Sequence, residues 1–233
     1  MAWGGKDAGS SFWCDGGIRA LVSERVWEAL AAQGMARRYR TGDVMVAQGH
    51  AGGGRVIVLV DGRVKVTRNE VDGTEVLLAI RDAGEIIGEM SAIDRGPASA
   101  TVTALRPCAG RIMPVGDFLA FAGRHDLIRA LMAHASARRR ESEQIRVELT
   151  TLPVSRRLIR TLLRLSDAMG VRAGGTIAVD LGLPQEELAR AIGASRSQLA
   201  ASLARLREQG ILTTERRRVL IHDPERLRAL DGV

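Results

Sequence analysis

The chain has 233 residues, of which 45% are hydrophobic and 26% charged, so it is long enough for one large domain or two modest ones. No apolar run approaches the ~18 residues of a membrane helix, and the Gly-rich start, Met1 to Ser11, lacks the layout of an export signal. Two cysteines, Cys14 and Cys108, are too few for a disulfide framework and lack the spacing of a zinc or redox site. We therefore expect a cytoplasmic protein with no membrane segment and no metal site.

Positive charge is concentrated in the C-terminal third. The chain carries 34 Lys+Arg and 27 Asp+Glu, a net charge of +7. From position 150 onward there are 14 arginines and 9 acids, a difference of +5, which leaves +2 for the first 149 residues. This distribution predicts a polyanionic partner for the C-terminal third, although a solvated arginine-rich surface would have the same composition.

The N-terminal half predicts a short helix followed by strands. Ser23 to Gly34 has Val26, Ala29 and Leu30 at helical spacing. From Tyr39 to Val115, short β-branched runs alternate with glycine-bearing turns, a pattern typical of an antiparallel sandwich or barrel. The predicted strands are Val44 to Val46, Arg55 to Val60, Arg63 to Arg68, Glu75 to Ile80, Ser99 to Thr103 and Gly110 to Pro114.

One long helix, Asp117 to Leu152, is predicted next. Apolar and small residues recur in it at alternating spacings of four and three, which is the heptad pattern of helices that pair along their length. Packing of the helix on its own domain stays open as the alternative. Two members of this seam, Arg138 and Ser142, are polar, and such residues often set the register or contact a ligand. The seam comprises Leu131, Ala135, Arg138, Ser142, Ile145, Leu149 and Leu152.

The C-terminal part predicts a helix-turn-helix. Pro153 suits the start of a helix over Val154 to Met169; a loop over Arg172 to Gly175 and a strand over Thr176 to Asp180 follow. A short helix over Gln185 to Ile192 and a turn at Gly193-Ala194 then precede a second helix. The second helix begins at Ser195-Arg196-Ser197-Gln198, which fits a capping box, and its buried stripe is Leu199, Leu203 and Leu206.

The first turn of that second helix holds the predicted base-reading residues. Arg196 is the strongest candidate, because a guanidinium can contact guanine O6 and N7 together. Ile211 to Thr214 and Arg218 to His222 predict a hairpin beyond the helix, a basic wing suited to phosphate contacts. The other predicted DNA-binding residues are Ser195, Ser197, Gln198, Gln185, Arg205, Arg216 and Arg217.

In this order, a strand-rich domain, a long pairing helix and a winged helix-turn-helix resemble the cyclic-AMP receptor protein / fumarate–nitrate regulator (CRP/FNR) family. The resemblance covers about Tyr39 to Asp223. Its motifs are Gly42-Asp43, Gly84-Glu85-Ile86-Ile87-Gly88-Glu89-Met90, Gly96-Pro97-Ala98-Ser99-Ala100-Thr101-Val102 and Gly193-Ala194-Ser195-Arg196.

The resemblance implies an α+β fold with three parts. These are an N-terminal antiparallel β-roll of the cyclic-nucleotide-binding jelly-roll type over 1–116, a dimerisation helix over 117–152 and a winged helix-turn-helix over 153–233. It also implies a homodimer paired through 127–152 that binds a two-fold symmetric DNA site and contacts RNA polymerase. A small effector in the β-roll would control DNA binding, or the protein would act without one.

The β-roll departs from the pattern of the family's cyclic-nucleotide binders. Gly88-Glu89-Met90 keeps the segment that holds the ribose, but Ala98-Ser99 replaces the Arg-Ser pair that grips the cyclic phosphate. On the long helix, the Thr-Ser pair that meets the purine appears as Ser142-Glu143. A buried phosphate without its arginine loses its strongest contact. We therefore expect no cofactor and an effector other than cyclic AMP, or none; cyclic AMP stays open as the alternative.

Two further expectations concern this pocket. The resemblance aligns Glu89 with Arg138 across the pocket, so the two side chains are predicted to form an ion pair when no ligand is present. The family's iron–sulfur and haem options fail, because the cysteines are too few and the histidines, His50, His125, His134 and His222, are scattered and expected at surface or structural positions. Cys108 is expected to be buried and inert.

The DNA-binding head departs from the cyclic-AMP receptor as well. Arg196 matches the first of its three base readers, but Ser197 and Ala201 stand in place of a glutamate and a second arginine. We therefore expect an operator that differs from the receptor's own. Two other classes of function stay open as alternatives: a ligand sensor whose C-terminal domain contacts proteins, and an enzyme regulated by the β-roll. The chain shows no nucleophile–base pair, metal cluster or phosphate loop, and no catalytic residue is predicted.

Overall fold

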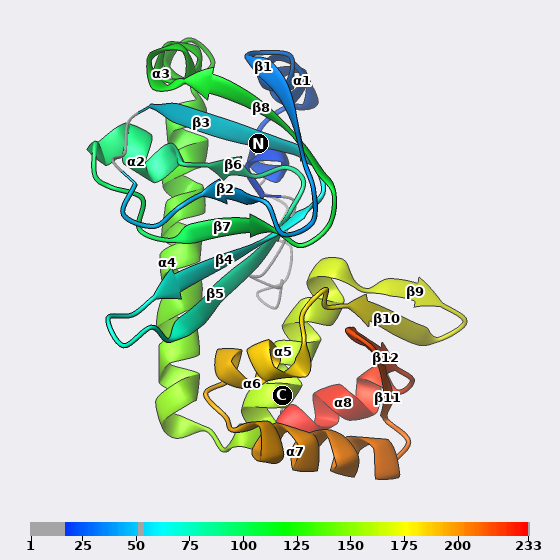
Figure 1. Cartoon of the computed structure of the whole chain (residues 1–233). Coiled ribbons are helices and arrows are strands. Elements are labelled where there is room, and N and C mark those ends of the chain that lie inside the picture. The colour runs from blue at the N-terminus through cyan, green and yellow to red at the C-terminus, as the bar shows by residue number, and fades with distance from the viewer. Residues whose placement is uncertain (1–16, 51–53, 233) are drawn as a thin grey trace. The chain divides into compact units, whose positions relative to one another are not determined.

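The computed structural model describes residues 17–50 and 54–232, drawn in colour in Figure 1. These residues form two compact units that divide within one long helix, the first ending at Arg139 and the second continuing from Arg140. The antiparallel sheets, the long helix and the C-terminal helix-turn-helix confirm the predicted fold class. The three predicted domain ranges stay a prediction. In the described part of the chain, no helix is both long and apolar enough to cross a membrane.

The N-terminal unit begins with a 3-10 helix, Gly17–Leu21, and helix α1, Glu24–Ala31. Helix α1 starts where predicted, because the Ser23 hydroxyl accepts a hydrogen bond from the Val26 backbone N–H at 3.3 Å. It ends earlier than predicted. Its buried side chains are Trp27 and Leu30, while Val26 and Ala29 are only partly buried.

Two four-stranded antiparallel sheets form the predicted sandwich (Figure 1). One sheet has the strand order β1-β8-β3-β6 and the other β2-β7-β4-β5. The predicted strands are all present, with shifted ends, and the strands β1 and β6 are additional. Their bounds are β1 Met35–Tyr39, β2 Val44–Val46, β3 Arg55–Asp61, β4 Arg63–Asn69, β5 Glu75–Asp82, β6 Ile86–Ile87, β7 Thr101–Ala104 and β8 Cys108–Pro114.

A short helix, α2, Glu89–Asp94, leaves the sandwich directly after β6. Gly88 precedes it with φ 87°, a left-handed conformation that glycine adopts without strain. The core of the unit has two parts. One lies between the sheets, around Leu59 and Val64; the other joins β3 and β8 to the helices, with Phe118 and Leu127 among its fully buried side chains.

The predicted single helix over 117–152 is two helices, α3 Val115–Arg124 and α4 Leu127–Thr151. The break lies at Asp126, whose φ of 52° is incompatible with a continuing α-helix. Phe118 and Phe121 pack into the core on the α3 side of the break, which explains why an apolar pattern continues across it. The predicted seam is also wrong at its beginning, since Leu131 is buried in the core of its own β-roll.

The C-terminal unit is a winged helix-turn-helix (Figure 1). Its sheet has the order β11-β12-β10-β9. The segment predicted as a loop over 172–175 is a hairpin in which β9 pairs with β10 across Gly174-Gly175, and a last helix, α8, was not predicted. The elements are α5 Val154–Met169, β9 Val171–Ala173, β10 Thr176–Asp180, α6 Gln185–Ala191, α7 Arg196–Glu208, β11 Leu212–Glu215, β12 Arg218–Ile221 and α8 Pro224–Asp231.

Buried ion pairs connect α5 to the end of α4 and to α8. Arg160 reaches both Asp231 of α8 at 2.8 Å and Glu148 of α4 at 3.3 Å, and Arg164 reaches Glu148 at 2.8 Å. Glu148 and Asp231 are buried, so each charge needs these partners. Helix α5 therefore holds both the end of α4 and the C-terminal helix in place through these ion pairs.

Candidate DNA-binding head and effector pocket

The helix-turn-helix is formed by α6, a two-residue turn and α7. Gly193 has φ 60°, and the Ala194 N–H donates to the Ala189 carbonyl at 2.9 Å to close the turn. A Cβ atom on Gly193 would lie 2.9 Å from Leu149 Cδ2, so the end of α4 approaches this turn closely. Glycine is needed here for both its conformation and its size.

The predicted capping box is present at the start of α7. The Gln198 N–H donates to Ser195 Oγ at 3.2 Å, and the Ser195 N–H donates to Gln198 Oε1 at 2.9 Å. Ser197 Oγ lies 2.9 Å from Ser195 Oγ. Three of the four predicted first-turn residues thus use their side chains to order the helix start. Arg196 is exposed and makes no hydrogen bond or ion pair with any residue that the structure describes.

The remaining predicted DNA-binding residues are exposed. Gln185 begins α6, and Arg205 lies in the last turns of α7. Arg216 and Arg217 form the tip of the β11–β12 wing, where the Arg217 carbonyl accepts from the Leu181 N–H at 2.9 Å. The wing tip is therefore tied to the segment that leads into α6.

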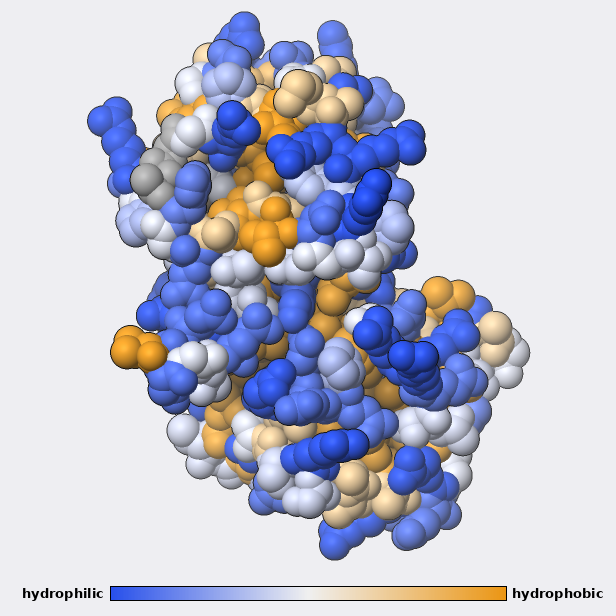
Figure 2. Space-filling view, viewed as in Figure 1, coloured by the Kyte–Doolittle hydropathy of each residue, from blue (hydrophilic) through white to orange (hydrophobic). Residues whose placement is uncertain are grey.

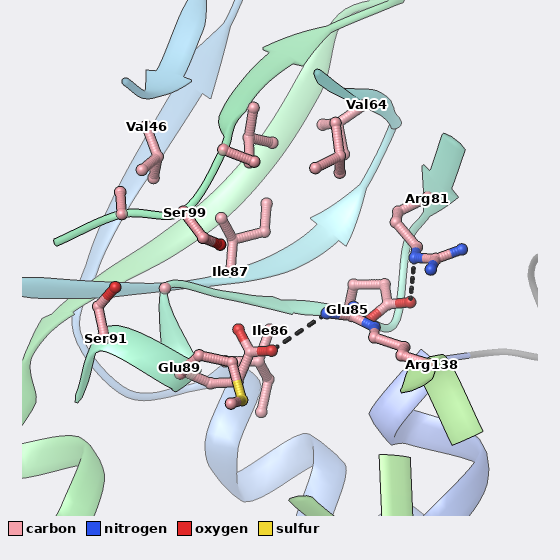
Figure 3. A pocket seen from close by; sticks show the side chains of 16 residues that line it. Val46, Val64, Arg81, Glu85, Ile86, Ile87, Glu89, Ser91, Ser99 and Arg138 are labelled. Atoms are coloured by element: carbon pink, nitrogen blue, oxygen red, sulfur yellow. Dashed lines mark hydrogen bonds and ion pairs between the residues drawn. The ribbon is translucent and has the colours of Figure 1, made fainter. Parts of the chain in front are cut away.

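The predicted effector residues meet at a cavity of about 120 Å³ in the β-roll (Figure 3). Of the seven candidates, six line this cavity, and the seventh, Ser142, does not and is exposed. The whole lining is Val46, Val64, Val66, Arg81, Glu85, Ile86, Ile87, Gly88, Glu89, Met90, Ser91, Ala98, Ser99, Ala100, Val102 and Arg138.

A cluster of charged side chains occupies one wall of this cavity. Arg138 of α4 donates to Glu89 Oε1 at 3.1 Å, which confirms the predicted pair, and to Glu85 Oε2 at 2.6 Å. His134 Nε2 lies 2.9 Å from the same Glu85 oxygen, and Arg81 Nε lies 3.7 Å from Glu85 Oε1. Figure 3 shows Arg138 entering between the two carboxylates.

Sequence reasoning missed Glu85, Arg81 and His134. A signal was present for His134, because it lies four residues before Arg138 on α4. Side chains four apart on a helix lie on one face. His134, expected at a surface or structural position, has the structural role.

The two carboxylates of the cluster differ in acidity. Burial alone would raise the pKa of Glu85, but Arg138, the hydrogen bond from His134 and Arg81 outweigh it and lower the pKa to about 2. For Glu89, burial is the stronger influence and raises the pKa, because Arg138 is the main opposing charge and Glu85 adds repulsion. The Arg138 contact to Glu85 is the shorter one, which agrees with this order.

Comparison with known proteins identifies both units. Residues 36–125 match the model of the cyclic nucleotide-binding domain, and residues 156–230 match that of the Crp-like helix-turn-helix domain. The CRP-like cAMP-activated global transcriptional regulator of Mycobacterium tuberculosis is 30% identical over 212 residues, which cover 91% of this chain and 94% of that one. This chain belongs to the CRP/FNR family of transcription regulators.

Two other matches extend the comparison. The cyclic AMP receptor protein of Thermus thermophilus is 29% identical over 177 residues, 76% of this chain and 78% of that one. The structure of FixK2 from Bradyrhizobium japonicum superposes with a TM-score of 0.72 at 20% identity, covering 86% of this chain and 98% of that one, which shows the fold. Members of the family are DNA-binding regulators, so the prediction that the chain is not an enzyme is confirmed.

The charged pocket of this family member is small, and its two arginines contact carboxylates. Its volume of about 120 Å³ is below the ~300–1,000 Å³ usual for ligand pockets. Ala98 offers no side-chain donor, and the two arginines of the lining, Arg81 and Arg138, contact carboxylates. A phosphate would have to compete with Glu85 and Glu89 for these cations.

Cys108 is buried, as expected. Its Sγ atom contacts the Arg106 carbonyl at 3.1 Å and the Arg63 carbonyl at 3.4 Å, and burial raises the pKa of the thiol. A protonated, buried thiol reacts slowly with oxidants. Cys14 lies outside the described residues. Among the residues that are described, no three His, Cys, Asp or Glu side chains could hold a metal ion together.

Proposed function

We propose that this family member acts in the cytoplasm as a homodimer that reads a two-fold symmetric DNA site, with Arg196 as its main base-contacting residue. The observation that supports this proposal is the pattern of side-chain hydrogen bonds in the first turn of α7. Ser195, Ser197 and Gln198 hold one another there, whereas the exposed Arg196 guanidinium has no hydrogen-bonding partner among the described residues. A long cation at the start of a recognition helix is placed to reach major-groove base edges.

The other basic residues supply contacts to the DNA backbone in this proposal. Arg205 follows Arg196 on α7, and Arg216 and Arg217 extend from the wing, where phosphates border a helix in the major groove. Gln185, at the start of α6, is placed for a further phosphate contact. Ser197 and Gln198 assist by presenting Arg196. RNA polymerase is the protein partner that transcription control requires.

Pairing along α4 is the proposed basis of the dimer. On this helix, Ile128, Met132 and Leu149 are exposed although they are apolar. Ile128 and Leu149 are 21 residues apart, which is three heptads, and Met132, Ala135 and Ser142 fall on the same stripe. The stripe shares Ala135, Ser142 and Leu149 with the predicted seam. The stripe omits Leu131 and Arg138 of the predicted seam, because both side chains contact residues of the β-roll.

A charge on this stripe should weaken the dimer. Met132 is 67% exposed in the single chain, and Met132→Glu would place two carboxylates, one from each chain, in the paired interface. We expect the dimer dissociation constant, measured by sedimentation equilibrium, to rise at least ten-fold. Met35→Glu on β1, at a similarly exposed methionine, is the matched control. A Met132→Glu protein that dimerises as the parent does would rule out this interface.

We further propose that cyclic AMP is not the effector. The M. tuberculosis relative is described as cAMP-activated, but in this chain Ala98 removes a cation and Glu85 and Glu89 neutralise Arg138. Another small molecule could bind in the pocket and break these ion pairs. Alternatively, the ion pairs could hold the pocket in the conformation that an effector stabilises in other proteins. In either case the cluster joins α2 to α4 within the N-terminal unit.

Selection from random DNA tests the function. The purified full-length protein should enrich one symmetric sequence whose half-sites are about one helical turn apart, the spacing that paired helix-turn-helix heads require. We expect the same sequence and the same affinity with and without added cyclic AMP. Failure to retain DNA at any salt concentration would favour the rival function, a ligand sensor whose C-terminal unit contacts proteins. Enrichment only with cyclic AMP would overturn the effector proposal alone.

A further inference from the structure

A second and larger cavity opens in the β-roll. Its volume is about 590 Å³, within the ~300–1,000 Å³ typical of ligand pockets. It shares Val46, Gly88, Ser91 and Ala98 with the smaller pocket, but its other lining residues come from β1, β2, β3 and β8, together with Ala47, His50 and Gly54. It therefore adjoins the smaller pocket, and ten of its 14 lining residues lie outside that pocket.

The floor of this cavity is apolar. Ile57 of β3 and Ile112 of β8 are direct cross-strand neighbours and both are buried. The Tyr39 ring lies beside them, since a Cβ on Gly110 would touch both Ile57 and Tyr39. Met45 of β2 faces this floor from the other sheet. Figure 2 shows hydrophobic residues in a hollow of this face of the β-roll, bordered by strongly hydrophilic ones.

The rim of the cavity is cationic. Arg37 lies with its guanidinium 5.2 Å from the centre of the Tyr39 ring, and Arg55 lies near enough to the same tyrosine to oppose the rise in its pKa that burial causes. Both arginines are exposed, and neither forms an ion pair with a described residue. The described residues that line the cavity include no aspartate or glutamate. The smaller pocket differs in this respect, because Glu85 and Glu89 match its two arginines.

We propose that this cavity binds an amphipathic anion, a small carboxylic acid with a hydrocarbon body. Arg37 and Arg55 at the rim supply the positive charge for its carboxylate, which accepts charge-assisted hydrogen bonds there. The hydrocarbon body covers Ile57, Ile112 and Met45 and removes their apolar surface from water. The proposal concerns the β-roll alone and does not depend on how the C-terminal unit contacts DNA.

Decanoate is the probe for this proposal, used below its micelle-forming concentration with the full-length protein. We expect saturable binding in titration calorimetry, at least ten-fold tighter than that of decan-1-ol, because the alcohol keeps the hydrocarbon and lacks the charge. The double variant Arg37→Gln, Arg55→Gln should weaken decanoate binding at least ten-fold and leave decanol unchanged. Its affinity for DNA without decanoate should equal that of the parent protein.

Two control variants locate the site. Arg38→Gln removes the neighbouring charge on β1, and this residue does not line the cavity, so its decanoate affinity should match that of the parent. Met90→Ala alters the lining of the smaller pocket at an exposed side chain and should likewise leave decanoate binding unchanged. The proposal is overturned if decanoate does not bind, if decanol binds equally well, or if the double variant binds decanoate as Arg38→Gln does. None of these outcomes would alter the case for DNA binding.

Discussion

The variant Arg196→Ala should bind the selected DNA site about 30-fold more weakly or worse than the parent protein. Each bidentate contact of arginine to guanine contributes ~1–3 kcal/mol of base discrimination. A dimer loses two such contacts, one per half-site, and ~2 kcal/mol already corresponds to about 30-fold. Fluorescence anisotropy with the selected duplex and a scrambled one, at several salt concentrations, measures the effect.

Binding of Arg196→Ala to the scrambled duplex should change much less. The remaining arginines of α7 and the wing still contact phosphates, and this association weakens steeply with salt. Arg190→Ala is the matched control: it removes one exposed arginine of α6 whose partner is Glu186 at 3.2 Å. If Arg196→Ala keeps the parent's ratio of specific to scrambled affinity at matched salt, Arg196 does not read bases.

The second large effect is expected on stability. Glu85→Gln should lower the free energy of unfolding of the N-terminal unit by ~3–5 kcal/mol, the usual loss when one partner of a buried ion cluster is removed. Arg138, Arg81 and His134 would then lack their shared carboxylate. Glu89→Gln is the matched control. Burial raises the pKa of Glu89, which means that the folded protein disfavours the charged carboxylate. Removal of this charge should therefore leave the free energy of unfolding nearly unchanged or raise it. Urea denaturation at pH 7 compares the two variants.

The same cluster predicts a dependence of stability on pH. The pKa of Glu85 is lowered from 4.5 to about 2 by folding, so its stabilising effect is complete above about pH 4.5 and is lost as the pH falls toward 2. Glu85→Gln should lack this loss. The contribution of Glu89 to stability changes with pH in the opposite direction. Because folding raises the pKa of Glu89, this contribution decreases as the pH rises past 4.5. Equal pH profiles for the parent and Glu85→Gln, or a larger loss in Glu89→Gln, would contradict this account of the cluster.

Local patterns predicted the C-terminal unit well. Helix α5 and strand β10 have the predicted ends, and the turn at Gly193 and the capping box at Ser195 are formed as expected. Each of these features is specified by residues that are close in sequence, such as a proline before a helix or a serine three residues before a glutamine. The hairpin β9–β10 was missed because Arg172 and Gly174 resemble loop residues.

The N-terminal unit was less predictable where partners are distant in sequence. Strand β1 contains Arg37 and Arg38 and has no apolar alternation; it is a strand because β8 pairs with it. The break at Asp126 was hidden, because Phe121 and Leu131 continue an apolar pattern into the same core. Glu85 was missed as a site residue because two of its basic partners, His134 and Arg138, lie on α4, 49 and 53 residues further along the chain, which no local spacing indicates.

The close approach of Leu149 to Gly193 has a consequence for the DNA. Arg157 reinforces it by donating to the Leu149 carbonyl at 2.7 Å and to the Gly193 carbonyl at 3.1 Å. The end of α4 and the turn before α7 are thus one rigid piece. If two chains pair along α4, the separation of their recognition helices is set by the pairing and cannot adapt. One extra base pair between half-sites turns one of them by about 36° around the duplex. The protein should bind such an operator as weakly as it binds unrelated DNA, even though every contacted base is unchanged.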